Sequence, residues 1–332
     1  MPITRSQLPL RKMSLWLAIF VLLAQFFAGD LDVLAQQRKI RIALPSMSLT
    51  DLPLAIAYKR GFYREEGLDA ELIQIAGSPA AAALVAENVD YIAHTSRIVA
   101  LAVRGGGVKL IFSHAVKPSF YLVARPEIKK INDLKRQTVG ISSFGGTSYR
   151  LTKLTLENFG LYPPKDVALR ALGEDSLRLA AMIGNSVQAT LLAPDYVTKA
   201  RELGFNVLVY SGDVVELPMN GLGTTDKKIR EERDEVRRVI RASLRGLRFL
   251  HEDRGGSTAV IIDWRKMTPA NAEAAYDLGV RIFGRDGAPT DKGLRLLLSI
   301  TQEDLKLTKE ISSSVVTDFR ILKEVQKELG IQ

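Results

Sequence analysis

The sequence predicts an α/β protein of two doubly wound domains, each built on a sheet with helices on its faces. Three observations support this prediction: apolar strand-like stretches alternate with helix-period stretches, the alternation occurs in two successive halves, and a turn rich in serine and threonine follows the first strand of each half. Alternating strands and helices are typical of parallel sheets covered by helices. The length of 332 residues suits about two domains of ordinary size.

The first 35 residues have the layout of a secretory signal peptide. Three basic residues precede an uncharged run at 13–29, and Ala35 closes a small-residue motif. A basic start, an apolar core and a small-residue end are typical of a cleaved export signal. A transmembrane anchor is the alternative, although the run is short against the roughly 20 residues that span a bilayer. We expect cleavage after Ala35, and because no cysteine follows the core, a free periplasmic protein rather than a lipid-anchored one.

The first half of the remaining chain contains three strand patterns and two helix patterns. The strands are short apolar runs, and the helices carry apolar residues at helical spacing. The first helix ends at a glycine, and the second is rich in alanine. In order, the pattern predicts a strand at 39–45, a helix at 53–63, a strand at 68–75, a helix at 78–87 and a strand at 89–95.

The second half repeats this order, with a strand at 138–143, a helix at 148–160, a strand at 166–172, a helix at 176–185 and a strand at 187–193. Part of the match holds position by position without gaps. Ser78, Ala82, Ala83, Leu84, Val85 and Val89 align with Ser176, Ala180, Ala181, Met182, Ile183 and Val187. We therefore expect two similarly wound domains.

Part of the net charge of +9 lies in one segment, residues 226–254, which has ten basic and seven acidic residues. Apolar residues recur there at helical spacing, with charges of both signs between them, so we predict one long amphipathic helix with a solvated face. The alternative is a basic stripe for nucleic acid. An exported protein rarely meets nucleic acid, so we expect no nucleic-acid partner, and we expect a monomer.

Small hydroxyl residues follow the first strand of each half, and in the second half two glycines accompany them. In open parallel sheets, ligands bind beyond the carboxyl ends of the strands, where the N–H groups of the next helix point outward. The alternative is that these residues only form turns and helix caps. The residues concerned are Ser46, Ser48 and Thr50 in the first half, and Ser142, Ser143, Gly145, Gly146, Thr147 and Ser148 in the second.

The sequence lacks a recognisable catalytic motif. It has no cysteine, only three histidines, and no HExxH, GxSxG, Walker or dinucleotide fingerprint. His94 and His114 end predicted strands, and the acidic residues near the turns, Asp51, Asp195 and Glu216, form no readable acid–base pair. We therefore predict binding without chemistry, with no catalytic residue, cofactor or metal. A periplasmic enzyme on the same scaffold remains the alternative.

Three segments, residues 56–73, 87–93 and 131–167, resemble the substrate-binding proteins of ABC importers, in the branch for sulfonates, taurine, nitrate and thiamine-pyrimidine precursors (SsuA/TauA-like). "IAYKRGFYREEGLDAELI" resembles the first-domain signature of that family. "INDLKRQTVGISSFGGTSYRLTKLTLENFGLYPPKDV" resembles the opening of its second domain. The resemblance covers residues 39–225 well and the rest only in helical character. A cytosolic, cysteine-rich enzyme branch of the family does not fit a chain without cysteine.

The resemblance implies a two-lobed periplasmic-binding-protein fold, type II-like, with the ligand between the lobes. It implies three ligand loops, at 46–50, 94–96 and 142–147. Phe120 and Asn220, near the two predicted crossings between lobes, complete our candidate set. The aromatic residues Phe120, Tyr121 and Phe144 are candidates for stacking on a ring of the solute. The candidate binding residues are Ser46, Ser48, Leu49, Thr50, His94, Thr95, Ser96, Phe120, Ser142, Ser143, Gly145, Gly146, Thr147 and Asn220.

The same resemblance implies that the chain crosses between the lobes twice, at about 118–124 and 216–224. The expected lobes are 39–120 plus 222–332, and 121–221, with the crossings as hinges. The expected partners are a small polar or anionic solute (a sulfonate, a carboxylate or a heterocycle) and an inner-membrane ABC permease with its ATPase. A receptor that signals to a sensor protein is the remaining alternative.

Overall fold

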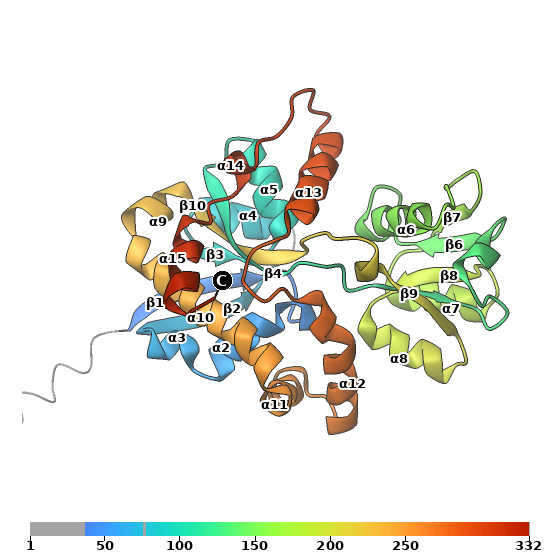
Figure 1. Cartoon of the computed structure of the whole chain (residues 1–332), viewed down its shortest axis with the longest axis horizontal. Helices are drawn as coiled ribbons and strands as arrows, with labels where there is room; N and C mark the ends of the chain where they lie inside the picture. Colours follow the sequence, from blue (N-terminus) through green and yellow to red (C-terminus); the bar gives the residue numbers. More distant parts are fainter. Residues whose placement is uncertain (1–36, 76–77, 332) are drawn as a thin grey trace, which may run out of the picture. The chain divides into compact units, whose positions relative to one another are not determined.

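The computed structural model describes residues 37–75 and 78–331 of the chain (Figure 1). The predicted signal peptide, residues 1–35, lies outside the described residues. Within the described ranges, no helix is both long enough and apolar enough to cross a membrane.

The first sheet has five strands in the order β2-β1-β3-β10-β4. Strands β1 and β3 are parallel, whereas β10 is antiparallel to both of its neighbours. Apolar residues of β1 and β4, such as Ile42 and Leu110, are fully buried, as expected for strands covered by helices. The strands are β1 (Arg38–Leu44), β2 (Leu68–Gln74), β3 (Tyr91–Ile92), β4 (Val108–Ala115) and β10 (Asn220–Thr225).

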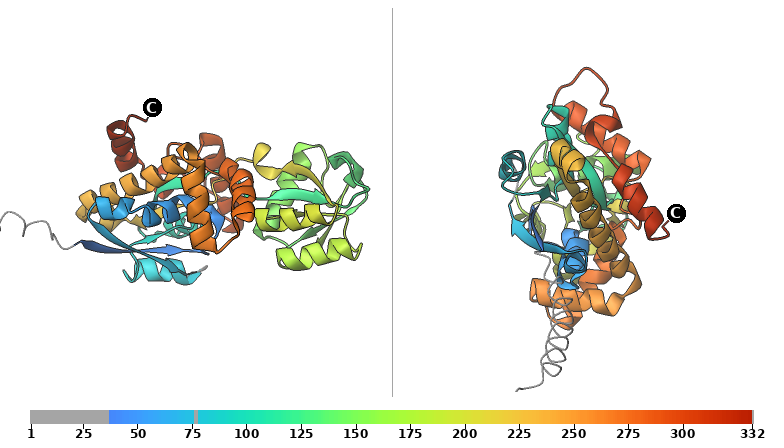
Figure 2. Two further views of the ribbon diagram at one scale, coloured as in Figure 1. Left: turned by 90° about the horizontal axis from the view of Figure 1, so that it is seen from below. Right: turned by 90° about the vertical axis from the view of Figure 1, so that its left-hand side faces the viewer.

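The second sheet also has five strands, in the order β7-β6-β8-β5-β9. Strand β6 is parallel to β7 and β8, and β5 is antiparallel to β8 and β9. The left panel of Figure 2 shows these green to yellow strands gathered with their own helices. The strands are β5 (Tyr121–Ala124), β6 (Thr138–Ile141), β7 (Ala168–Ala171), β8 (Ala189–Leu192) and β9 (Asn206–Tyr210).

The two sheets share one topology, which confirms the predicted pair of similarly wound α/β units. In the first sheet β1 lies between β2 and β3, and the antiparallel strand β10 follows β3. In the second sheet β6 lies in the same way between β7 and β8, and the antiparallel strand β5 follows β8. The predicted strands pair in parallel, β1 with β3 and β6 with β7 and β8, and each sheet contains an antiparallel strand in addition. Strands β5 and β10 are the first strands that the chain forms after it passes from one sheet to the other. No α-helix lies between β4 and β5 or between β9 and β10, so neither connection has the crossover helix that a parallel connection needs.

Helices cover both sheets. Around the first sheet lie α2 (Leu52–Lys59), α3 (Phe62–Glu65), α4 (Ser78–Val85), α5 (Thr95–Val103), α9 (Asp226–Glu231), α10 (Arg233–Glu252), α11 (Arg254–Arg265), α12 (Pro269–Gly279), α13 (Asp291–Asp304), α14 (Ser313–Val316) and α15 (Arg320–Glu328). With the second sheet lie α6 (Thr147–Asn158), α7 (Asp175–Ile183) and α8 (Pro194–Glu202). Four short 3-10 turns complete the described elements: η2 (Leu49–Asp51), η3 (Ile131–Leu134), η4 (Ser211–Asp213) and η5 (Val280–Ile282).

The basic segment 226–254 forms two helices rather than the one predicted, because the backbone leaves the helical region at Glu232 (φ −119°, ψ 38°). The predicted amphipathic character is confirmed for α10, whose Val236, Ile240 and Leu247 are fully buried. Its apolar side packs on α2 so closely that a Cβ at Gly246 would collide with the carbonyl oxygen of Pro53. The basic side is neutralised by acidic residues of neighbouring helices.

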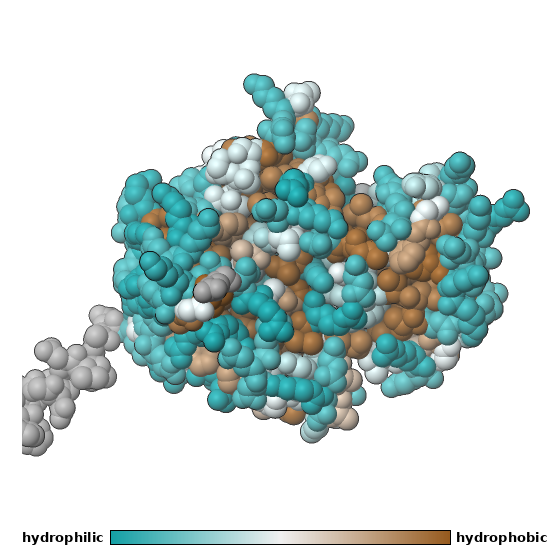
Figure 3. Space-filling view, in the orientation of Figure 1, coloured by the Kyte–Doolittle hydropathy of each residue, from teal (hydrophilic) through white to brown (hydrophobic). Residues whose placement is uncertain are grey.

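Polar residues cover most of the molecular surface, but apolar surface shows on the side of the second sheet (Figure 3). Several large apolar side chains from this part of the chain are exposed. They include Phe144, Phe159, Tyr162, Leu177, Ile183 and Leu203.

Candidate functional site

The loop after β1 brings three of the predicted site residues together. Ser48 Oγ lies 2.7 Å from Thr50 Oγ1, and Asn220 Nδ2 donates to Thr50 Oγ1 at 3.2 Å. Asn220 is the first residue of β10, so a residue 170 positions away in sequence fixes the hydroxyl of this loop. Ser46 lies at the start of the loop and is half-buried. Leu49, at 7% exposure, packs into the apolar core, so its side chain serves the fold rather than the loop surface.

A buried polar pair that the sequence did not reveal lies behind this loop. Asp51 and His114 are both fully buried, and Asp51 Oδ1 lies 3.4 Å from His114 Nε2. Asn220 Nδ2 donates to the same Asp51 oxygen at 2.8 Å. Burial raises the pKa of Asp51, and the neighbouring His114 ring and the hydrogen bond from Asn220 oppose that rise. No partner for Asp51 could be read from the sequence, and the structure places the His114 ring beside it.

The loop after β3 leaves the sheet beside the loop after β1, because β1 and β3 are parallel neighbours. His94 precedes α5, and its Nδ1 lies 3.5 Å from Ser96 Oγ. Burial, reinforced by the positive charge of Arg97, lowers the pKa of His94 to about 4, so the ring is neutral near pH 7. Thr95 is fully buried, and its hydroxyl has no hydrogen-bond partner among the described residues. Ser96 is exposed.

The loop before α6 is organised by its own serines. The backbone N–H of Ser142 donates to Ser148 Oγ at 2.7 Å, and Ser148 Oγ donates to Ser142 Oγ at 3.2 Å. The N–H of Gly146 donates to the carbonyl oxygen of Ser143 at 3.1 Å, whereas the side chains of Ser143 and Thr147 are exposed. The loop therefore presents hydroxyls at the start of a helix of 12 residues, where unpaired N–H groups and the helix dipole favour a polar or negative group.

Different structural features favour glycine at the two glycine positions of this loop. Gly145 has a φ of +77°, which only glycine adopts at little cost. Gly146 has an ordinary φ of −77°, but a Cβ there would lie 2.8 Å from Ser143 Oγ. Glycine at 146 is therefore favoured by the close approach of the serine hydroxyls, which a Cβ would displace, rather than by backbone conformation.

Arg150 is a contact of this loop that the sequence analysis missed. Its Nε donates to the carbonyl oxygen of Gly145 at 3.2 Å. The same guanidinium forms an ion pair with Asp304 and lies 3.7 Å from Glu303, both at the end of α13. An arginine one turn into a helix that follows a glycine loop is the sequence signal that points to such a contact.

The aromatic candidates differ in exposure. Tyr121 is buried, its ring centroid lies 4.9 Å from that of Tyr210, and its hydroxyl donates to the carbonyl oxygen of Leu278 at 2.8 Å. Phe120 is partly buried against the apolar core. Phe144 is 66% exposed and lies edge-on to Tyr149, with ring centroids 5.7 Å apart. Of these aromatic candidates, Phe144 is the one whose ring is free to meet a solute.

The candidate residues thus form two groups. The loops at 46–50 and 94–96, with Asn220, belong to the first sheet, and the loop at 142–147 belongs to the second. Among the described residues, no hydrogen bond joins one group directly to the other. Nor do the described residues contain a cluster of histidines and carboxylates that could hold a metal ion.

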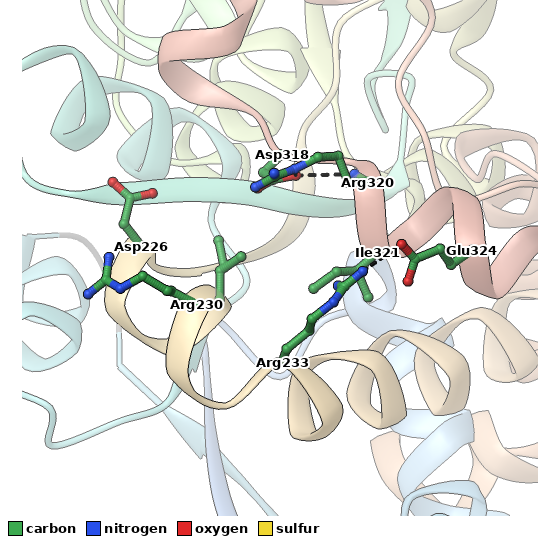
Figure 4. A pocket seen from close by; sticks show the side chains of 8 residues that line it. Asp226, Arg230, Arg233, Asp318, Arg320, Ile321 and Glu324 are labelled. Atoms are coloured by element: carbon green, nitrogen blue, oxygen red, sulfur yellow. Dashed lines mark hydrogen bonds and ion pairs between the residues drawn. The ribbon is translucent and has the colours of Figure 1, made fainter.

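A cavity of about 550 Å³ lies elsewhere, among α9, α10 and α15 (Figure 4). Figure 4 shows Arg233 directed at Glu324 and Arg320 lying alongside Asp318, with nitrogen–oxygen distances of 2.5 and 2.6 Å. Arg233 and Arg320 therefore already have carboxylate partners within the cavity.

Solved structures share this fold. A putative sulfonate ABC transporter protein, the periplasmic sulfonate-binding protein SsuA from Methylobacillus flagellatus KT, superposes with a TM-score of 0.69 at 15% identity, over 89% of this chain and 96% of that one. The desulfurization enzyme DSZB superposes with a TM-score of 0.64 at 13% identity, over 88% of this chain and 99% of that one. The periplasmic-binding-protein fold is confirmed, and it carries a binding protein in one case and an enzyme in the other.

Sequence comparison matches the chain to one binding protein and to one family model. The riboflavin-binding protein RibY from Chloroflexus aurantiacus is 26% identical over 208 residues, or 59% of this chain. The match spans little more than half of that relative, 57% of its length. The family model described as NMT1/THI5-like matches residues 50–254, more than half of the chain, and includes the loops at 94–96 and 142–147. The chain therefore belongs to the NMT1/THI5-like family.

Proposed function

We propose that the protein is a solute receptor that binds a small polar or anionic molecule between two lobes and delivers it to an ABC permease. The observation that carries the proposal is the equivalence of the two loops, at 46–50 and 142–147. Each follows the first predicted strand of one half of the chain, β1 or β6, at the same place in two sheets of one topology, and each presents hydroxyl groups before a helix. Paired loops of this kind suit recognition of one solute from two sides.

In this proposal the lobes are 39–120 plus 222–332, and 121–221, and they close by rotation at the two crossings. The N-terminus of α6, with Thr147 and Ser143, binds the polar or charged end of the solute. The exposed ring of Phe144 contacts an apolar or planar part. The sulfonate-binding structural neighbour and the riboflavin-binding relative support these two classes of solute, an anion and a heterocycle.

The protein acts as a receptor rather than as an enzyme. The chain has no cysteine, and its paired acid and base, Asp51 and His114, are fully buried behind the loop rather than presented at its surface. The DSZB structure makes an enzyme on this fold the competing function, so the test must follow the fate of the solute.

The first experiment is mass spectrometry of small molecules that co-purify with the protein, followed by a thermal-shift screen that includes taurine and riboflavin. We expect a bound solute to be recovered unchanged after stoichiometric incubation. Recovery of a chemically altered solute would replace the receptor proposal with the enzyme. Small-angle scattering should show a more compact protein with the solute present.

The proposed location is the periplasm, reached through the signal at 1–35 that is cleaved after Ala35, and the receptor works there as a monomer. N-terminal sequencing of periplasmic material should find a chain that begins near Gln36. A chain that begins at Met1 and sediments with membranes contradicts this location.

A further inference from the structure

One buried carboxylate, that of Asp51, lies where the first candidate loop meets two strands of the first sheet. Asp51 Oδ1 accepts a hydrogen bond from Asn220, the first residue of β10, at 2.8 Å. The same oxygen lies 3.4 Å from Nε2 of His114, the second-last residue of β4. Thr50, next to Asp51, accepts a second hydrogen bond from Asn220. The loop is therefore hydrogen-bonded to the start of β10 and lies in close contact with the end of β4.

These two strand ends are the points at which the chain leaves and re-enters the first sheet. After β4, residues 116–120 lead to β5 of the second sheet, and after β9, residues 211–219 lead back to β10. At the first sheet the two connections lie side by side, since the N–H of Met219 donates to the carbonyl oxygen of Ala115 at 2.7 Å. A side chain that holds both strand ends is therefore close to both crossings.

Helix capping does not explain the burial of this carboxylate. Asp51 is the N-terminal cap residue of α2, but its side chain makes no capping hydrogen bond. Its second oxygen, Oδ2, has no hydrogen-bond partner among the described residues, and neither ring nitrogen of His114 meets the geometry of a hydrogen bond. Buried polar atoms without partners are costly and tend to mark a functional constraint.

We propose that Asp51 is a positioning residue that couples the loop at 46–50 to both crossings between the lobes, through Asn220 and His114. The proposal rests on the proposed function, because coupling matters only if the lobes close on a solute bound by that loop. A shift of either crossing moves Asn220 or His114, which both contact the Asp51 carboxylate. Asp51 is also the N-terminal cap residue of α2, the helix that follows the loop. Closure of the two lobes then changes the conformation of the loop at 46–50 at the same time.

Amide hydrogen exchange of the unliganded protein tests the coupling. Replacement of Asp51 by alanine should accelerate exchange by about tenfold in three segments at once, 46–50, 116–120 and 214–219, since these share the lost contact. Asp51→Asn keeps an oxygen that accepts from Asn220, and exchange should stay within about threefold of the wild type. Asn220→Ala should reproduce the pattern of Asp51→Ala, which covers the case in which the first variant does not fold.

Tyr63→Phe is the matched control. It removes another buried hydrogen bond of the first sheet and its helices, from the Tyr63 hydroxyl to Ser243 at 2.9 Å, away from the loop. Acceleration confined to 46–50, or acceleration spread over the first sheet as in the control, overturns the coupling. Because no solute is added, failure of the proposed function does not affect this result, and failure of the coupling leaves the proposed function intact.

Discussion

Arg150 of α6 forms an ion pair with Asp304 of α13, while its Nε donates to the carbonyl oxygen of Gly145 at 3.2 Å. α6 packs on the second sheet, whereas α13 packs on α5 of the first. One side chain therefore contacts both the candidate loop of the second sheet and a helix that belongs with the first. Ion pairs at this level of exposure contribute about 0–1 kcal/mol. The contact is therefore suited to shifting the relative positions of the two sheets rather than to stabilising the fold.

Replacement of Arg150 by alanine should weaken solute binding by about three- to tenfold, because the loop loses a support and α6 loses its ion pair with α13. The melting temperature should change little. Calorimetry with the co-purifying solute, at low and high salt, measures the effect, which should shrink as salt screens the wild-type pair.

Lys153→Ala is the control for Arg150, since Lys153 lies in the same helix and its ion pair with Glu157, at 3.8 Å, stays within that helix. Equal effects of the two replacements would mean that the contact with Asp304 has no part in binding.

Gly146→Val should abolish binding while the protein still folds. A Cβ at this position lies 2.8 Å from Ser143 Oγ, so a branched side chain must displace the serines that shape the loop. Gly184→Ala is the matched control, because its added Cβ meets only an ordinary contact of 3.5 Å. Calorimetry with melting curves separates loss of binding from loss of fold, and wild-type affinity for Gly146→Val would make this loop a helix cap and nothing more.

Thr147→Ala should weaken binding by up to about tenfold, since one hydrogen bond to a neutral group contributes about 0.5–1.5 kcal/mol and one to an anion contributes more. The exposed hydroxyl makes no hydrogen bond within the described structure that would compete with a solute. Thr147→Ser, which keeps the hydroxyl, should bind like the wild type. If the serine and alanine variants bind equally, the hydroxyl does not contact the solute.

Sequence reasoning succeeded where the signal was local. The alanine-rich helix at 78–87 and the helix at 176–185 could be predicted from their periodicity, and their matched spacing predicted that the two sheets share a topology. The antiparallel direction of β5 and β10 could not be predicted, because it depends on which distant strand each one joins. Likewise, the pairing of Asp51 with His114 joins residues 63 positions apart, and no spacing rule predicts such a contact.

The same distinction applies to the aromatic residues. Tyr121 and Phe144 both follow or flank predicted strand ends, and the sequence gives no reason to separate them. In the structure Tyr121 faces Tyr210 in the core, whereas Phe144 lies on the loop surface. Exposure is a property of the packed sheet and its helices, so it could not be derived from either stretch alone.

Gly246→Ala should destabilise the fold by about 1–3 kcal/mol, because the added methyl group meets the backbone of Pro53 where α10 crosses α2, and overpacking of this kind forces helices apart. Gly279→Ala, at a position with open space around its Cβ, should be neutral or slightly stabilising. Urea unfolding of both variants measures the difference. Equal stability of the two variants would mean that α10 and α2 are farther apart than described.

The stability of the protein should fall in mild acid, in part because of His94. Burial and Arg97 lower the pKa of this residue to about 4 in the folded state, against 6.5 in its ordinary state, so the unfolded chain binds a proton that the folded chain does not. The contribution is fully present above pH 6.5 and is lost as the pH falls toward 4. Because His94 is partly exposed, we expect a loss on the order of 1–2 kcal/mol. Asp51, whose pKa is raised, acts in the opposite sense, so the comparison must isolate His94. Urea unfolding of the wild type and of His94→Gln at pH 7 and pH 4.5 does so: the variant should lose less stability between the two pH values, and an equal loss in both proteins would show that the ring is solvated and titrates normally.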